Sequence, residues 1–372
     1  MPPRLLIPGP VELEPEVLAI LAQPVQAHYG DAWVEVHNET ISLLQAVYAT
    51  TGRVFMLPGS GSMAVDSAAH STFLPGETVI VGNNGWFGER SRDILQSNGI
   101  NVIEVIGDPR QPLDPDAMLR TLKQHPEAVG VALVHLETST GVLNPVETIV
   151  KQVHAHSDAL VLVDAVTGLA AADLPMDAWD IDLCVTASQK ALGAPPGLGM
   201  VAVSDRAWTK ISARPEGTAR SWYLDLKRWQ WFVENWADWH PFPVTMPTSL
   251  VLALRAALRS LLREGVGARR VRLQHMADHL RGALTDMGLP LFVPAEQMAA
   301  TITAAYCPEG VRSTTIRDYV LREQNLQITT GFGPFKEQVI RIGHMGGAVS
   351  DDHINDLIAA LRAFMAEQGV KG

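Results

Sequence analysis

Two ionisable residues stand at the ends of apolar segments, where they could do chemistry. Lys190 lies in TASQKALGAPPGLG (186–199), whose prolines and glycines prevent a long helix, so we expect the lysine on a tight turn. Asp164 ends the apolar segment ALVLVDA (159–165), where a buried carboxylate needs a cation or hydrogen-bond donors. Taken singly, Lys190 is as well explained as a solvated loop residue and Asp164 as a turn cap.

A glycine-rich turn, PGSGSMAVDSAA (58–69), follows a predicted strand and leads into a predicted helix. Its main-chain amides, with the hydroxyls of Ser60 and Ser62, suit a phosphate at a helix N-terminus. It has neither a GK[ST] ending nor GxGxxG, so no Walker loop or dinucleotide fingerprint is indicated. A further strand ends in HLETSTG (135–141), for which turn chemistry is a sufficient explanation.

The combination of these segments points to one cofactor. A phosphate cradle, an acid at one strand end and a lysine at another are what pyridoxal phosphate (PLP) needs. The cradle would anchor the phosphate, Asp164 would pair with the ring nitrogen, and the amine of Lys190 would form the Schiff base.

The elements that must position these residues alternate between short apolar runs and amphipathic helical stretches. Several runs are apolar on both faces, as buried parallel strands are, and this indicates a doubly wound α/β sheet. After Pro247 a long helical stretch leads into a second unit with strands at 300–306, 326–330 and 338–343 and a closing helix capped by Ser350. The predicted strands of the first unit are 53–57, 77–83, 101–106, 129–136, 159–165, 182–187 and 199–204.

Length and composition indicate how many domains the chain has. The chain has 372 residues, 47% of them hydrophobic, which is more than one domain usually holds. We therefore expect an N-terminal arm (1–24), a large PLP-binding domain (25–262) and a small C-terminal domain (263–372).

Charge and cysteine content predict the partners and the compartment. A net charge of −11 without a basic block argues against nucleic acid and anionic membranes, and no apolar run reaches the roughly 20 residues that span a bilayer. Cys184 and Cys307 cannot build a disulfide framework and lack metal-ligand spacing, so we expect core residues, no metal and a cytoplasmic location.

The chain resembles the class V aminotransferases of the fold type I PLP enzymes, closest to the alanine–glyoxylate and serine–pyruvate group. The resemblance implies a large domain with a seven-stranded, mostly parallel sheet sandwiched by helices, a small C-terminal α+β domain, and a homodimer with its active site at the interface. The motifs that carry it are PGP (8–10), GSGSMAVDSAA (59–69), NGWFGER (84–90), HLETSTGVLNP (135–145), VDAV (163–166), SQKALGAPPG (188–197) and GFGPFKEQVIRIGHMG (331–346).

The resemblance also implies a role for each matching residue. Lys190 binds the cofactor aldehyde and Asp164 keeps the pyridinium nitrogen protonated, while Arg341 takes the substrate α-carboxylate with its planar guanidinium. The other implied cofactor contacts are Ser60, Gly61, Ser62 and Gln189 at the phosphate, Phe87 and Val166 on the two ring faces, and Thr138 near the ring hydroxyl.

Four departures from the family pattern concern the pocket. Phe87 stands where relatives often have Trp, and Ser62 where they often have His or Thr. The segment ADWHPFPV (237–244) lacks a Tyr and a Thr that donate to the phosphate from the partner subunit, with His240 and Thr245 as the candidate substitutes. HYGDAW replaces a segment with an HR pair, so we expect Tyr29 in an altered substrate pocket.

The expected reaction is transfer of the amino group of alanine or serine to glyoxylate or pyruvate. One carboxylate-binding arginine and an aromatic pocket favour a small neutral donor over a dicarboxylate. A different donor, such as ureidoglycine, pyridoxamine or an aminophosphonate, is the main alternative. Cysteine desulfuration would need a mobile cysteine, and a catalytically silent module would not need Lys190, Asp164 and Arg341 together.

Overall fold

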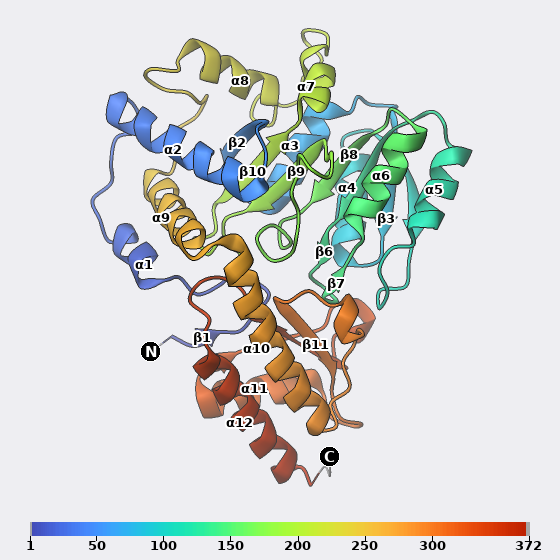
Figure 1. The fold of residues 1–372 in the computed structure, drawn as a ribbon, viewed down its shortest axis with the longest axis vertical. Helices are drawn as coiled ribbons and strands as arrows, with labels where there is room; N and C mark the ends of the chain where they lie inside the picture. Colours follow the sequence, from blue (N-terminus) through green and yellow to red (C-terminus); the bar gives the residue numbers. More distant parts are fainter. Residues whose placement is uncertain (1, 370–372) are drawn as a thin grey trace.

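The chain folds around one large and one small β-sheet, joined by long helices (Figure 1). The computed structural model describes residues 2–369, so residue 1 of the expected arm and residues 370–372 of the expected small domain lie outside the described residues. The expected division at residues 24 and 262 stays a prediction.

The large sheet has seven strands in the order β2-β10-β9-β8-β5-β3-β4. Only β10 runs antiparallel to its neighbours; the other pairs are parallel. Its central strands, β8 and β9, are buried almost throughout, as their continuous apolar sequences predict. The strands are β2 (Arg53–Pro58), β3 (Thr78–Asn83), β4 (Asn101–Ile106), β5 (Ala128–Val134), β8 (Leu160–Asp164), β9 (Leu183–Ala187) and β10 (Leu198–Val203).

Helices cover this sheet and confirm the predicted fold class (Figure 1). α3 and α4 pack against each other and against the strands, and α5 and α6 form a second such pair. The sheet is sandwiched by helices, which leaves its strand ends as the place for a ligand. The helices of this part are α1 (Pro15–Leu21), α2 (Asp31–Tyr48), α3 (Gly61–Thr72), α4 (Trp86–Ser97), α5 (Pro115–Gln124), α6 (Val146–His156), α7 (Asp205–Ser212), α8 (Leu226–Asn235) and α9 (Thr248–Glu264).

The segment predicted as one strand over 129–136 is divided in the structure. β5 ends at Val134, and the chain then leaves the large sheet to form β6 (Leu136–Glu137), which pairs with β7 (Val142–Leu143) in a short antiparallel hairpin. Because the chain leaves the large sheet at this point, the residues after 136 lie near the site described below.

The small sheet has the order β11-β14-β13 and is antiparallel. The strands predicted at 300–306 and 338–343 are confirmed, and Ser350 is the N-cap of the last helix, as expected. The segment predicted as one strand over 326–330 is divided at Ile328: Leu326–Gln327 pairs with the N-terminal arm, and Thr329–Thr330 joins the small sheet. The elements are β11 (Ile302–Tyr306), β13 (Thr329–Thr330), β14 (Val339–Gly343), α10 (Val266–Asp286), α11 (Ser313–Gln324) and α12 (Asp351–Glu367).

Two details connect the parts of the chain. The helix after Pro247 is broken at Gly265, whose φ of 90° ends α9 and begins α10. Near the N-terminus, β1 (Arg4–Leu5) pairs in parallel with β12 (Leu326–Gln327), so the start of the arm is attached to the C-terminal part.

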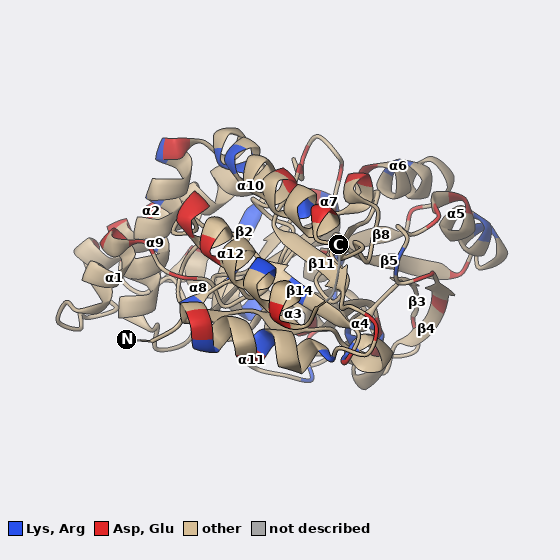
Figure 2. Cartoon of the chain, turned by 90° about the horizontal axis from the view of Figure 1, so that it is seen from below, with Lys and Arg blue, Asp and Glu red and all other residues tan. Residues whose placement is uncertain are grey.

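Charges of both signs alternate on the outer helices (Figure 2). In α11, Arg317 pairs with Asp318 and Arg322 with Glu323. None of the helices within residues 2–369 is both long and apolar enough to cross a membrane. Cys184 is buried and Cys307 is half-buried, and both are free.

Candidate active site

A cavity of about 210 Å³ opens where several strands of the large sheet end. Asp164 is the last residue of β8, and Lys190 follows the neighbouring strand β9 by three residues. The cavity brings together eight of the predicted site residues: Ser60, Gly61, Ser62, Phe87, Asp164, Val166, Gln189 and Lys190. It is also lined by Val65, Arg90, Ser91 and Ile94.

Asp164 lies in a setting that disfavours its charge. Burial raises the pKa of Asp164 to about 6, opposed by a hydrogen bond that Val166 N–H donates to Oδ1 at 2.9 Å and by the charges of Arg90 and Lys190; nearby Glu137 raises it further. The carboxylate is therefore charged at neutral pH but readily protonated below it, and a cationic partner in the cavity would favour the charged form.

Lys190 is affected in the opposite direction. Burial, followed by the charge of Arg341, lowers the pKa of Lys190 to about 8, while Asp164 opposes the shift. Part of the amine is unprotonated at neutral pH, which is the form that can attack an aldehyde or accept a proton.

The N-terminal arm reaches this amine. Lys190 Nζ donates to the main-chain oxygen of Pro8, and a Cβ on Gly9 would lie 2.6 Å from Nζ. Gly9 also has a φ of 102°, so only glycine fits this close approach without strain. The sequence indicated PGP only as a family motif and not as a contact of the lysine.

The glycine-rich turn has the geometry of an anion cradle. Ser60 is the N-cap of α3, and its hydroxyl accepts from Met63 N–H at 3.3 Å. The N–H groups of Gly61 and Ser62 come before the first residue that can bond within the helix, so they remain free to donate to a ligand. A Cβ on Gly61 would lie 2.6 Å from Val166 Cγ2, so the turn packs directly against the end of the sheet.

A buried carboxylate that the sequence did not single out holds the next element. Glu137 is fully buried and accepts from the N–H groups of Phe87 (3.0 Å), Gly88 (3.3 Å) and Ser139 (3.0 Å), and from the Ser139 hydroxyl. Burial raises the pKa of Glu137, and these hydrogen bonds oppose the shift. The signal available in the sequence was an acidic residue, Glu137, directly after the predicted strand 129–136. Glu137 caps α4 from a different element and thereby fixes Phe87.

Arg341 comes from the small sheet, in the middle of β14, and is 4% exposed. Its Nε donates to Thr330 O and its Nη1 to Thr138 O, each at 2.8 Å. The guanidinium carbon lies 4.3 Å from the centroid of the Phe332 ring, a cation–π distance. Burial lowers the pKa of Arg341 to about 10, with Glu137 opposing, so the side chain stays charged at neutral pH.

Three predicted residues do not line the cavity: Arg341, described above, Thr138 and Tyr29. The Thr138 hydroxyl lies 2.7 Å from Thr167 Oγ1 and is buried, so Thr138 meets the site through its main-chain contact with Arg341. Tyr29 is 52% exposed and packs its ring near His28 and Trp239. A role for Tyr29 stays a prediction.

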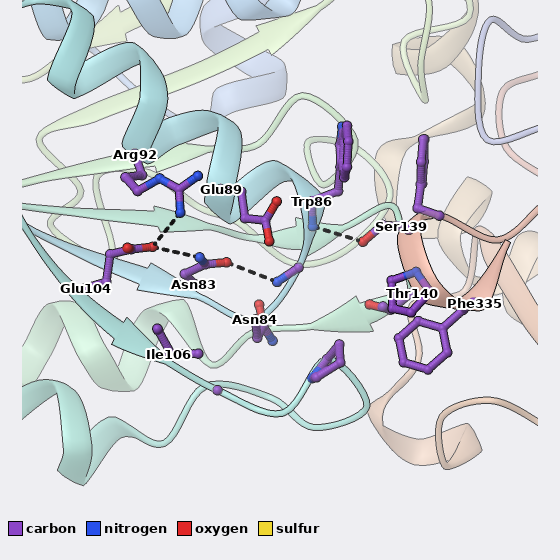
Figure 3. A pocket seen from close by; sticks show the side chains of 16 residues that line it. Asn83, Asn84, Trp86, Glu89, Arg92, Glu104, Ile106, Ser139, Thr140 and Phe335 are labelled. Carbon is purple, nitrogen blue, oxygen red and sulfur yellow. Dashed lines mark hydrogen bonds and ion pairs between the residues drawn. The ribbon is translucent and has the colours of Figure 1, made fainter.

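A second pocket, of about 310 Å³, is lined in part by Trp86 and Glu89 of α4, the sequence neighbours of Phe87 and Arg90 in the first cavity (Figure 3). Trp86 stacks on Phe332 in its wall, with centroids 5.4 Å apart and planes 8° from parallel. Trp86 N–H donates to Ser139 Oγ at 3.3 Å, so the wall is tied to the turn that follows Glu137. Phe332 therefore contacts both Trp86 of this pocket and Arg341.

A lysine and an acid at adjacent strand ends, beside an anion cradle, define a PLP enzyme of the α/β class. The family Aminotransferase class-V matches residues 27–336. The chain belongs to this family, whose members are PLP-dependent aminotransferases, and the predicted enzyme class and cofactor are thereby confirmed.

Relatives match along nearly the whole chain. It is 34% identical to the alanine–glyoxylate aminotransferase of Oryctolagus cuniculus, over 97% of this chain and 92% of that protein. It is 33% identical to a protein of Synechococcus sp. named soluble hydrogenase, small subunit, over 98% of this chain and 93% of that one. A pyridoxamine–pyruvate transaminase of Mesorhizobium japonicum is 30% identical over 98% and 92% of the two chains.

Solved structures agree with the fold. The crystal structure of ureidoglycine–glyoxylate aminotransferase from Bacillus subtilis has a TM-score of 0.93 and 28% identity, covering 99% of this chain and 94% of that one. That of an alanine–glyoxylate aminotransferase from Nostoc sp. has a TM-score of 0.93 and 31% identity, covering 98% and 96%.

The residues of the cavity fit PLP. The side-chain oxygen of Gln189 is buried and has no partner within residues 2–369, so the amide still has hydrogen-bonding capacity for a ligand. The cradle supplies the N–H donors of a helix start, Asp164 supplies an anion, and Lys190 supplies an amine with a lowered pKa. The phosphate, the ring nitrogen and the aldehyde of PLP thus each have a complementary partner among the lining residues.

Proposed function

We propose that this aminotransferase moves the amino group of a small neutral amino acid, alanine or serine, to glyoxylate or pyruvate. The observation that carries the proposal is the setting of Arg341: a buried guanidinium beside the Phe332 ring, with Trp86 stacked behind that ring. One arginine suits one α-carboxylate, and the aromatic surface favours a short uncharged side chain.

The hydrogen bonds of Arg341 restrict how it would bind the carboxylate. Its Nε and one Nη1 hydrogen are used by the main-chain oxygens of Thr330 and Thr138. The remaining donors are on Nη1 and Nη2, so we assign the substrate carboxylate to this end of the guanidinium, in a bidentate pair.

We assign the proton transfers to Lys190. PLP, when bound, supplies an electron sink for the bond that breaks at the substrate Cα. Lys190 would take the proton from Cα of the amino donor and, in the second half-reaction, deliver a proton to Cα of the acceptor, and its pKa of about 8 suits a group that must act in both directions near neutral pH. Asp164 would hold the ring-nitrogen proton, and Ser60, Gly61, Ser62 and Gln189 would hold the phosphate. Phe87 and Val166 would contact the ring, and the main-chain oxygen of Thr138 fixes Arg341.

A half-reaction panel tests the substrate. The purified protein with PLP is mixed with one amino acid at a time, and the loss of visible cofactor absorbance is followed. We expect alanine and serine to react far faster than aspartate and glutamate, and glyoxylate or pyruvate to restore the spectrum. Faster reaction with a dicarboxylic amino acid would overturn the donor assignment.

The runner-up is a different donor on the same machinery. The names of two relatives, a ureidoglycine–glyoxylate transaminase and a pyridoxamine–pyruvate transaminase, support this alternative donor. The panel therefore includes pyridoxamine, ureidoglycine and an aminophosphonate.

A cytoplasmic location is proposed as well, because both cysteines are free.

A further inference from the structure

Arg90 lines the cofactor cavity, although the sequence motifs assigned it no role. It follows Phe87 by three residues in α4, and side chains at this spacing share one face of a helix. Its guanidinium carbon lies 4.7 Å from the centroid of the Phe87 ring, and its Nη1 donates to Ser62 Oγ at 3.3 Å. Arg90 thus bridges the residue expected to stack on the ring and the cradle expected to hold the phosphate.

The charge of Arg90 is not neutralised by a carboxylate. Among the described residues, Ser62 is its one side-chain hydrogen-bond partner, and no acid lies within ion-pair distance. Arg92, two positions along the same helix, instead pairs with Asp93 at 2.8 Å and with Glu104 at 3.5 Å, on the side of the second pocket (Figure 3). The two arginines differ in what they face: Arg90 is a free cation at the cavity, and Arg92 is a structural one.

A cofactor phosphate needs more positive charge than the cradle provides. It carries roughly two negative charges near neutral pH, whereas a helix N-terminus contributes about half a positive charge. The first turn of α3 contains no basic residue; its sequence begins with Gly61, Ser62 and Met63. The charge of Arg90 already reaches this site, because it lowers the pKa of both Asp164 and Lys190.

We propose that Arg90 is the cation of the phosphate site and binds the PLP phosphate together with Ser62 and the N–H groups at the start of α3. This contact comes from the same subunit as the cradle. The inference rests on PLP dependence and not on which amino donor is used.

Comparing two ligands separates a phosphate contact from a ring contact. PLP and pyridoxal have the same ring and aldehyde, but pyridoxal lacks the phosphate. Dissociation constants of both are measured on cofactor-free protein by tryptophan fluorescence, for the parent, Arg90→Gln, Arg90→Lys and the matched control Arg92→Gln. Thermal unfolding checks that each variant is folded.

We expect Arg90→Gln to weaken PLP binding by about 10-fold to 150-fold, the range for loss of a hydrogen bond to a charged group. Pyridoxal binding should stay within about two-fold of the parent, Arg90→Lys should lie between the two, and Arg92→Gln should match the parent. Inorganic phosphate should compete with PLP less well in Arg90→Gln than in the parent.

Two results would overturn the proposal. If Arg90→Gln changes PLP and pyridoxal binding equally, in either direction, the guanidinium acts on the ring face of Phe87 and not on the phosphate. If Arg92→Gln weakens PLP binding as much as Arg90→Gln, the weaker binding comes from the loss of any positive charge on α4 and not from a lost contact between Arg90 and the phosphate. Neither result bears on the alanine or serine assignment, which the half-reaction panel tests separately.

Discussion

At the scale of single residues, the lowered pKa of Lys190 makes its reactivity testable through pH. Only the unprotonated amine can attack the cofactor aldehyde, so the rate at which cofactor-free protein captures PLP should rise with pH and level off above about 8, well below the ordinary lysine value of 10.5. Stopped-flow absorbance measures this rate. A midpoint near 10.5 would contradict the lowered pKa of Lys190.

The variant Lys190→Ala should form no borohydride-reducible link to PLP and should not transaminate. A reducible link in this variant would contradict the assignment of Lys190.

A substitution at Asp164 should slow the chemical step without releasing the cofactor. An amide cannot stabilise the protonated ring nitrogen, so Asp164→Asn should keep bound PLP but lower the rate of Cα proton removal by about 10²- to 10³-fold, as for other lost electrostatic partners. Single-turnover kinetics with Cα-deuterated and ordinary alanine measures this step. Equal rates in variant and parent would disprove the role.

Arg341 should control substrate use without affecting the cofactor. Arg341→Lys keeps the charge but loses the planar fork, at a cost of about 1.5–3 kcal/mol for each hydrogen bond to a charged group. We expect kcat/KM for alanine or serine to fall about 10-fold to 150-fold, with PLP content unchanged. Loss of PLP instead would identify Arg341 as a structural or phosphate-side cation.

At the scale of elements, Glu137 connects the β6–β7 hairpin to the start of α4. Glu137→Gln places an amide NH₂ against donors from Phe87 and Gly88 or from Ser139, so it should lower the free energy of unfolding by about 1–3 kcal/mol. Because Phe87 loses its fixed position, the circular dichroism of bound PLP should also decrease. Denaturant unfolding and visible dichroism measure the two effects.

The control for this prediction lies in the same helix. Glu89 is exposed, so Glu89→Gln should change the free energy of unfolding by less than about 0.5 kcal/mol and leave the dichroism unchanged. If Glu137→Gln destabilises the fold but leaves the dichroism of PLP intact, the carboxylate caps α4 without positioning Phe87.

At the scale of the whole molecule, exposed aromatic side chains gather on and around α8. Trp222, Trp231 and Trp239 are each about half exposed, and Tyr29 lies beside Trp239. Such aromatic surface is typical of the centre of a protein interface. We therefore expect a homodimer that buries this region, which includes the WADWHPFPVTMP segment (236–247).

Sedimentation tests the homodimer. Trp231→Glu and Trp239→Glu should each weaken self-association by about 30-fold or more, the equivalent of an interface residue worth about 2 kcal/mol. Leu321→Glu, which alters an exposed apolar residue on α11, should leave association unchanged. A parent protein that is monomeric and fully active at working concentration would contradict the expectation.

Much of the fold could be predicted because its signals are local in the chain. The apolar runs that form β8 and β9 are buried on both faces, and the residues at their ends, Asp164 and Lys190, could be assigned together as a cofactor site. The end of a parallel strand is also the edge where ligands bind, so chain order alone brought these residues to one place.

The contacts that complete the site depend on packing between distant segments. Arg341 meets Thr138 across 203 positions, and Lys190 meets Pro8 across 182. The two donors from α4 to Glu137 and the place of Arg90 beside Ser62 likewise result from how α4 sits against its neighbours. The sequence by itself determined the family and the fold and predicted the reactive residues, because periodicity and motif order are set along the chain. Only the tertiary structure decided which charges face one another, because those distances are set by the joint packing of elements and not by any one of them.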